Sequence, residues 1–295
     1  MSAGFDRRLL RARFGAAARR YDEVAVLQRE VESRLLESAL ALQPPPARIV
    51  DVGCGPGRAL ALLRRRYRQA QVLGVDLALP MLRLARKAGG FWRSMPVACA
   101  DAAALPLPDA SVDLLHSSLC LQWLDDVPAA LDEFRRVLRP GGRLLLATFG
   151  PDTLLELREA WAAAGRHAQV SQFPGIAQLG DLLMTQGFRD PVLDRDVFTL
   201  SYERVDDLVT ELRAIGANNA RVDRPRGLVG RDAWQTLRQH SGQWRDAEGR
   251  LPATYEVLYV QARAPQPGQP RRGADGEIAS IPISAILRRP PRSGG

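Results

Sequence analysis

Residues 49–57 read IVDVGCGPG, where an apolar run leads into an acidic residue and then three glycines at alternate positions. A helical pattern begins at about Arg58. This order predicts a strand, a tight turn and a helix start within about a dozen residues. Glycine is needed where a backbone bends sharply and approaches a ligand closely, and a helix start adds unpaired N–H groups. The segment therefore predicts a ligand-binding loop, although a glycine-rich turn without a ligand would read the same.

The spacing of the glycines separates two classes of nucleotide-binding loop. A dinucleotide fingerprint is G-x-G-x-x-G and would place its third glycine at Arg58, whereas this chain has G-x-G-x-G. Asp51, two residues before the first glycine, suits a ligand with a cationic amino-acid part and would repel a pyrophosphate. The pattern resembles motif I of the class I S-adenosylmethionine (SAM) methyltransferases.

Length and composition limit the classes of protein to which the chain can belong. A chain of 295 residues with 46% hydrophobic content is typical of one large globular domain or a domain with appendages. No apolar run approaches the roughly 20 residues needed to cross a bilayer, so we expect neither a membrane segment nor a signal peptide. Three widely spaced cysteines lack a metal-ligand pattern, and their odd number suits a reducing compartment. We therefore expect a cytoplasmic monomer without a metal.

The net charge of +8 permits two interpretations. It could steer an acidic partner towards the protein, or it could reflect a mildly basic surface with no specific partner. The chain has no zinc-ligand spacing, no aromatic RNA-binding signature and no heptads, so we expect no nucleic-acid partner.

Strand and helix patterns alternate through the first half of the chain. Residues 1–43 have helical periodicity and end at three prolines. Beyond them we expect strands at 48–52, 71–75, 97–100, 112–116 and 143–149, helices at 58–67, 80–88 and 127–138, and a turn at 139–142. This alternation predicts an α/β fold with a mostly parallel sheet, helices on both faces, and ligand-facing loops at the carboxyl ends of the strands.

The pattern changes after residue 150. We expect helices at 151–164, 176–186, 202–215 and 231–240 and strands at 188–200 and 254–262, the last strand being antiparallel in a seven-stranded sheet. Residues 265–295 are rich in proline, glycine and arginine, which predicts a disordered basic tail. The predicted organisation is a helical lid at 1–43, a Rossmann-like domain at 44–264 with insertions at about 151–187 and 201–250, and the tail.

Two acidic residues follow strands beyond the glycine loop. Asp76 ends the second strand, where a carboxylate can accept hydrogen bonds from both ribose hydroxyls, or can simply cap the helix that follows. Asp101 ends the third strand, where a carboxylate can meet an adenine amino group, or can belong to a turn.

Together these features resemble the class I SAM methyltransferases over about residues 45–150. The resemblance implies SAM as the cofactor. It implies a set of cofactor-binding residues from the glycine loop and the strand ends: Asp51, Gly53, Cys54, Gly55, Gly57, Asp76, Leu77, Met81, Asp101, Ala102 and Ser117.

The flanking segments resemble the malonyl-acyl-carrier-protein O-methyltransferases of biotin synthesis over about residues 10–262. The resemblance is carried by residues 14–22 with Gln28-Arg29, by Gln122-Trp123, and by residues 154–161, 212–218 and 251–257. It implies methylation of the free carboxylate of a malonyl thioester, which masks its charge for fatty-acid elongation. Acyl carrier proteins are acidic, so part of the positive charge is expected to dock the carrier.

This chemistry requires little from the protein beyond placement. A carboxylate has an ordinary pKa near 4 and is ionised at pH 7, so no general base is needed. The protein must position the reactants and exclude water. Tyr21 is the candidate for a lid side chain that closes over SAM, with helix packing as the alternative, and Gln122 is the candidate that lies beside the methyl donor.

An anionic substrate favours a cation, ideally a planar bidentate one. The candidates are Arg19, Arg158 and Arg221, with Arg20, Arg224 and Arg226 as further ones. Two other functions stay open on the sequence: methylation of a small molecule or quinone precursor, and SAM binding by an assembly or modification factor similar to a protein arginine hydroxylase.

Overall fold

The glycine loop follows the central strand region of a seven-stranded sheet. The computed structural model describes residues 4–39, 42–90, 94–166, 170–222, 224, 227, 229–269, 271–273 and 276–278. The strand order is β3-β2-β1-β4-β5-β7-β6, formed by β1 (Arg48–Val52), β2 (Gln71–Asp76), β3 (Val97–Cys99), β4 (Val112–Ser118), β5 (Leu138–Phe149), β6 (Arg189–Tyr202) and β7 (Leu251–Arg263). Strands β1 to β5 pair in parallel, whereas β7 is antiparallel to β5 and β6. The predicted α/β fold with a mostly parallel sheet is confirmed.

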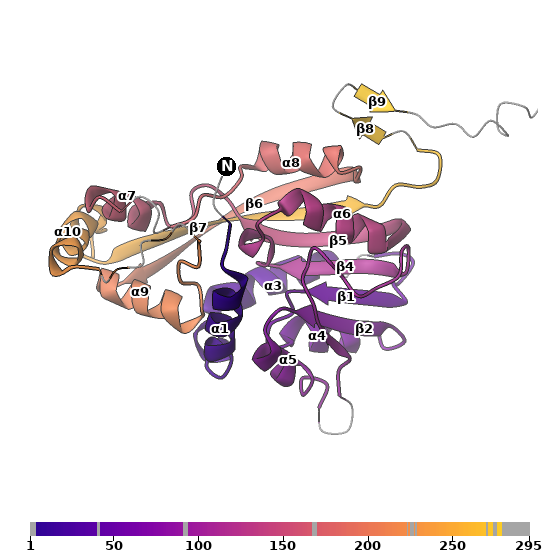
Figure 1. Cartoon of the computed structure of the whole chain (residues 1–295), viewed down its shortest axis with the longest axis horizontal. Coiled ribbons are helices and arrows are strands. Elements are labelled where there is room, and N and C mark those ends of the chain that lie inside the picture. Colours follow the sequence, from indigo (N-terminus) through magenta and orange to yellow (C-terminus); the bar gives the residue numbers. More distant parts are fainter. Residues whose placement is uncertain are drawn as a thin grey trace, which may run out of the picture.

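Helices cover both faces of this sheet (Figure 1). One face carries α3 (Val26–Ala39), α4 (Arg58–Arg66) and α5 (Leu79–Ala85), and the other carries α6 (Val127–Val137) and α8 (Ile176–Thr185). Successive strand residues point to opposite faces, so Ile49 packs in the first cluster and Val50 in the second. Because both faces are buried, the central strands have apolar residues at successive positions, such as Ile49 and Val50 in β1 and Leu114 and Leu115 in β4.

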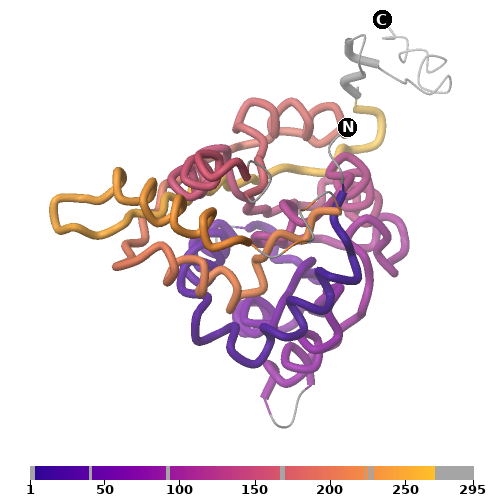
Figure 2. Tube along the Cα trace, turned by 60° about the vertical axis from the view of Figure 1, so that its left-hand side comes forward, coloured from indigo at the N-terminus to yellow at the C-terminus, as the bar shows by residue number. Residues whose placement is uncertain are grey.

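The described part of the predicted helical N-terminal segment contains three helices. They are α1 (Arg7–Ala17), α2 (Tyr21–Val24) and α3. The side chain of Asp6 caps α1 by accepting a hydrogen bond from the Leu9 N–H at 3.1 Å. The segment before α1 pairs with a distant part of the chain, since the Asp6 N–H donates to the Ala220 carbonyl at 2.8 Å. Figure 2 shows the N-terminal helices next to this later segment.

A second group of helices lies where β6 and β7 extend past the sheet (Figure 1). It contains α7 (Leu155–Ala163), α9 (Val205–Ala214) and α10 (Arg231–Ser241). Trp161 of α7 and Trp234 of α10 pack edge to face with ring centroids 5.5 Å apart. By contrast α8, which the sequence placed in the same insertion, contributes Leu179 and Leu183 to the core of the sheet.

Two predicted boundaries are wrong, and both lie at left-handed residues. The helix expected from residue 151 begins at Leu155, because Leu154 has a φ of 54°. The turn expected at residues 139–142 lies inside β5, which already pairs at Leu138 with Val112. Gly141 has a φ of 72° and donates its N–H to a carbonyl beyond β7, so the irregular backbone stays within the sheet.

The predicted tail contains a short strand pair. Strands β8 (Arg271–Gly273) and β9 (Gly276–Ile278) are antiparallel. The expected disorder of the other tail residues, at 270, 274–275 and 279–295, falls outside the described residues. Within the described ranges, none of the helices has the length and apolar character needed to span a membrane.

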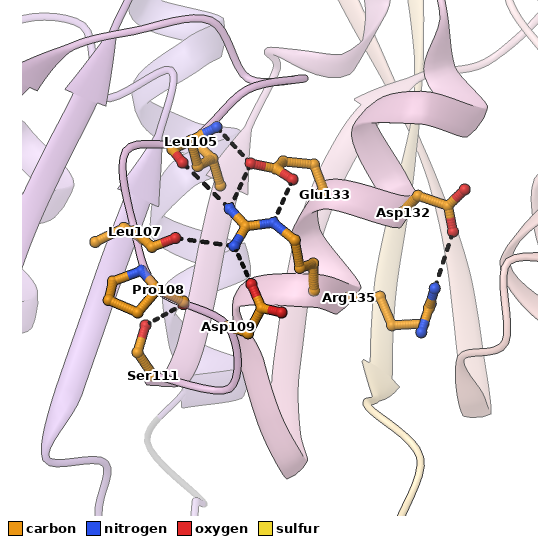
Figure 3. Close-up of polar contacts among 9 residues, drawn as sticks. Leu105, Leu107, Pro108, Asp109, Ser111, Asp132, Glu133 and Arg135 are labelled. Carbon is orange, nitrogen blue, oxygen red and sulfur yellow. Dashed lines mark hydrogen bonds and ion pairs between the residues drawn. The ribbon is translucent and has the colours of Figure 1, made fainter.

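The loop between β3 and β4 is attached to α6 through Arg136. Figure 3 shows Leu105, Leu107, Asp109 and Glu133 arranged around one guanidinium group. Arg136 donates to the carbonyls of Leu105 and Leu107 at 3.2 and 2.9 Å and to both oxygens of Glu133 at 2.7 Å. Glu133 in turn accepts the Leu105 N–H at 2.6 Å. This network fixes the segment that follows Asp101.

We expect Arg136→Gln to lower the free energy of unfolding by about 1–3 kcal/mol, because several charge-assisted hydrogen bonds are lost at a partly buried position. Arg135 on the same helix pairs with Asp132 at 3.2 Å, and Arg135→Gln should cost less than about 1 kcal/mol. Urea unfolding of the two variants measures both values. Equal losses would show that the Arg136 network is not the stabilising contact.

Candidate active site

A cavity of about 490 Å³ lies where the carboxyl ends of the central strands meet the N-terminal helices. Its sheet side includes Gly53, Gly55, Asp76 and Asp101. This is the position at which open parallel sheets bind ligands, because the loops leaving neighbouring strands converge there.

The glycine loop brings its backbone to the cavity without side chains. Gly55 has a φ of 51°, and a Cβ built on it would meet nothing within 4 Å, so this position faces open space. Gly57 has a φ of 92°, and its Cβ would lie 2.6 Å from the Cα of Ala85 in α5. Gly55 therefore leaves room for a ligand, whereas Gly57 lets two helices approach.

The carboxylate of Asp76 holds the loop in place. One oxygen accepts the Gly55 N–H at 2.9 Å, and the other accepts the Ala78 N–H at 2.7 Å. Burial raises the pKa of Asp76, and these two backbone donors act in the opposite direction. Asp76 thus lines the cavity and also stabilises the turn into α5.

Asp101 also belongs to both a turn and the cavity wall. It accepts the Ala103 N–H at 3.0 Å and forms an ion pair with Arg7 of α1. The ion pair brings the first lid helix over the ends of the strands.

Asp51 lies beneath the loop rather than in the cavity. Its Oδ1 is 2.8 Å from Nδ1 of His116 on β4, and both side chains are buried. Burial disfavours the imidazolium, but the charge and the hydrogen bond of Asp51 outweigh this, so the pKa of His116 lies above its usual value. The second oxygen of Asp51 and Nε2 of His116 are buried and have no hydrogen-bond partner among the described residues.

Glu32 of α3 adds a further buried carboxylate next to this pair. Burial, with the charge of Asp51 as the second cause, raises the pKa of Glu32 to about 7. Glu32 Oε1 lies 3.4 Å from Nε of Arg58, which also donates to Ser33 Oγ at 3.0 Å. These contacts join the lid helix α3 to the first residue of α4.

Tyr21 and Gln122 both reach the cavity wall. Tyr21 packs against Ala18 and Met81, and burial together with the charges of Glu32 and Asp76 raises its pKa. The Gln122 amide is fixed in place because it donates to the Leu119 carbonyl at 2.8 Å. Its neighbour Trp123 packs against the rings of Phe5 and Phe14 in the N-terminal segment.

The other half of the cavity is apolar. Helices α7, α9 and α10 and the adjoining loops contribute aromatic and branched side chains there: Leu157, Trp161, Phe173, Val209, Leu212 and Trp234. A polar rim on the sheet and an apolar wall on the helices are typical of a site that binds a nucleoside and an organic acceptor together.

The predicted site residues divide into two groups. Those that line the cavity are Tyr21, Gly53, Gly55, Asp76, Leu77, Met81, Asp101, Ala102 and Gln122. Those that do not line it are Asp51, Cys54, Gly57, Ser117, Arg19, Arg158 and Arg221. Ser117 is buried and donates to the Val52 carbonyl at 2.8 Å, and Ser118 takes the place next to the cavity. Of the described arginines, Arg11, Arg13 and Arg213 line it, and none of these was among the arginine candidates from the sequence. The candidate Arg226 lies outside the described residues.

The three cysteines form no disulfide. Among the residues that the structure describes, no group of histidine, cysteine and carboxylate side chains is arranged to hold a metal ion.

Two relatives with similar sequences, described below, share the same name. A family model described as a methyltransferase domain matches residues 50–146. A malonyl-[acyl-carrier protein] O-methyltransferase of Xylella fastidiosa is 46% identical over 291 residues, which are 98% of this chain and 99% of the relative. One of Halorhodospira halophila is 45% identical and covers 96% of each chain. A Bacillus halodurans protein of known crystal structure has a TM-score of 0.55 at 18% identity, over 80% of this chain and 99% of its own, which shows the fold alone.

Because the pKa of Glu32 is raised in the folded chain, its protonation favours folding. This contribution is complete below pH 4.5, the ordinary pKa, and is lost as the pH rises through about 7. We expect Glu32→Gln to gain stability relative to the unaltered chain between pH 5 and 8, by on the order of 1 kcal/mol. Thermal unfolding across this range measures it, with Glu37→Gln, an exposed position of the same helix, as the control. A difference that does not change with pH would contradict the assignment.

Proposed function

This chain belongs to the malonyl-[acyl-carrier protein] O-methyltransferase family, and we propose that it methylates the free carboxylate of a malonyl thioester on an acyl carrier protein. The methyl donor in this proposal is S-adenosylmethionine, and the reaction belongs early in biotin synthesis.

One arrangement carries this function: a glycine-lined, acidic strand edge faces a cavity whose opposite wall is apolar. The strand edge fits the donor, because Asp76 and Asp101 can accept hydrogen bonds from ribose and adenine while Gly55 leaves space beside its backbone. When bound, S-adenosylmethionine supplies an electrophilic methyl group, and the electrons of the broken carbon–sulfur bond remain on sulfur as the carbon–oxygen bond forms.

The described residues supply placement rather than proton transfer. A malonyl carboxylate is already ionised at neutral pH and attacks without a base. Tyr21 and the N-terminal helices cover the strand ends, and Trp161 and Trp234 close the far side, so water is excluded from the reacting groups. Gln122, held by the Leu119 carbonyl, contributes an amide beside the expected donor.

The proposal also includes the partner protein, the oligomeric state and the cellular compartment. The net charge of +8 supports docking of an acidic carrier protein. We further propose that the protein acts as a monomer in the cytoplasm and without a metal.

We expect Gly55→Val to weaken S-adenosylmethionine binding by at least about tenfold, because its side chain would project into the cavity. Gly249→Val is the matched control, since Gly249 also has a positive φ, 76°, and nothing within 4 Å, but lies in an exposed turn. Isothermal titration measures both affinities. Normal binding by Gly55→Val would mean that the donor does not bind at this loop.

We expect the protein to transfer labelled methyl groups to malonyl-acyl carrier protein and not to acetyl-acyl carrier protein, because only the malonyl group has a free carboxylate. The product should be an alkali-labile methyl ester. Malonyl-coenzyme A in the same assay shows how much the carrier contributes. Absence of transfer to both malonyl thioesters, in protein that binds the donor, would favour a non-methylating assembly factor.

A further inference from the structure

The charged groups of the cavity wall come from different parts of the fold. The acidic ones, Asp76 and Asp101, belong to the strand ends, and the basic ones, Arg11, Arg13 and Arg213, belong to the covering helices α1 and α9. A cationic donor and an anionic acceptor require this separation, because each binds against the opposite sign of charge.

Arg13 differs from the other two basic residues of the wall. Arg213 has its guanidinium 5.8 Å from the centroid of the Trp234 ring, so the indole already supports its charge. Arg11 is exposed to solvent. Arg13 is half-buried, and its Nη1 is fully buried without a hydrogen-bond partner in the described part of the chain.

Arg13 lies near a second arginine, Arg224, and near Asp6. Burial and the charge of Arg224 lower the pKa of Arg13, and Asp6 opposes them. Asp6 is already engaged, since it caps α1 through the Leu9 N–H and lies 4.0 Å from Nη2 of Arg224. Among the described residues, the guanidinium groups of Arg13 and Arg224 therefore share the Asp6 carboxylate in a partly desolvated corner of the site. An unpaired buried donor of this kind is costly, and a bound anion would relieve the cost.

We propose that Arg13 binds the free carboxylate of the acyl substrate and so selects acyl groups that end in a carboxylate over neutral ones. This inference rests on the proposed function. A guanidinium fork matches a carboxylate geometrically, and a carboxylate has about four lone-pair directions, so an oxygen lone pair stays available for methyl transfer. Methylation removes the negative charge, and the neutral ester then loses its ion pair with Arg13, which favours product release.

The test compares Arg13→Gln and Arg13→Lys with Arg8→Gln, an exposed position of the same helix. We expect Arg13→Gln to raise the KM for malonyl-acyl carrier protein by about 10- to 100-fold, the effect of losing a charged hydrogen bond. Arg13→Lys should lie between it and the unaltered chain, because it keeps the charge without the fork. S-adenosylmethionine affinity by isothermal titration should stay within about twofold for all three variants.

A second measurement compares the inhibition constants of two substrate analogues. Their ratio does not depend on the fraction of protein that is folded. We expect malonyl-pantetheine to inhibit the unaltered enzyme at least about tenfold more strongly than acetyl-pantetheine, and this preference should disappear in Arg13→Gln. If Arg13→Gln does not fold, the reduced preference in Arg13→Lys decides the question.

Three outcomes separate the possible failures. An unchanged KM and an unchanged malonyl preference in the Arg13 variants would overturn the inference alone. A fall in S-adenosylmethionine affinity equal to the rise in KM would overturn it too, because Arg13 would then hold the carboxylate of the donor. Absence of methyl transfer by the unaltered chain would instead overturn the proposed function.

Discussion

A partly buried carboxylate at the end of β2 holds the glycine loop and the start of α5 together, and the shape of the cavity depends on it. Asp76 accepts one backbone N–H from each, at 2.9 and 2.7 Å. Buried backbone donors need partners, and here a side chain provides them where no strand is available. The loop can therefore stay open at Gly55, where a side chain would occupy the space intended for a ligand.

The cavity also needs a cover, and the N-terminal segment builds it together with the segment that follows α9. The backbone of Gly4 and Asp6 pairs with Val222 and Ala220, so the segment before α1 and the segment after α9 form one wall. This contact keeps water from the strand ends and brings Arg13 and Arg224 close to each other. The same helices that exclude water thus also supply the positive charge that an anionic acceptor needs.

Local patterns predicted the strand edge of the site well. Gly55, Asp76 and Asp101 each follow a short apolar strand, and parallel strands bring such residues to one edge whatever the rest of the fold does. Asp51 also lies near the end of an apolar strand. Its side chain is nevertheless beneath the loop, because it pairs with His116 of the neighbouring strand. Which strand residue faces a cavity depends on its partners in the sheet, and sequence spacing does not contain this information.

The sequence alone determined the α/β fold, the glycine loop and the acidic strand ends, because these depend on periodicity and on the residues that each turn requires. Only the tertiary structure decided which arginines face the cavity. Arg19, Arg158 and Arg221 were the candidates from the sequence, yet Arg13 lines the wall. The reason is physical: a charge in an arginine-rich chain becomes distinctive through burial and the loss of partners, and both depend on how α1 packs against a segment about 200 residues away.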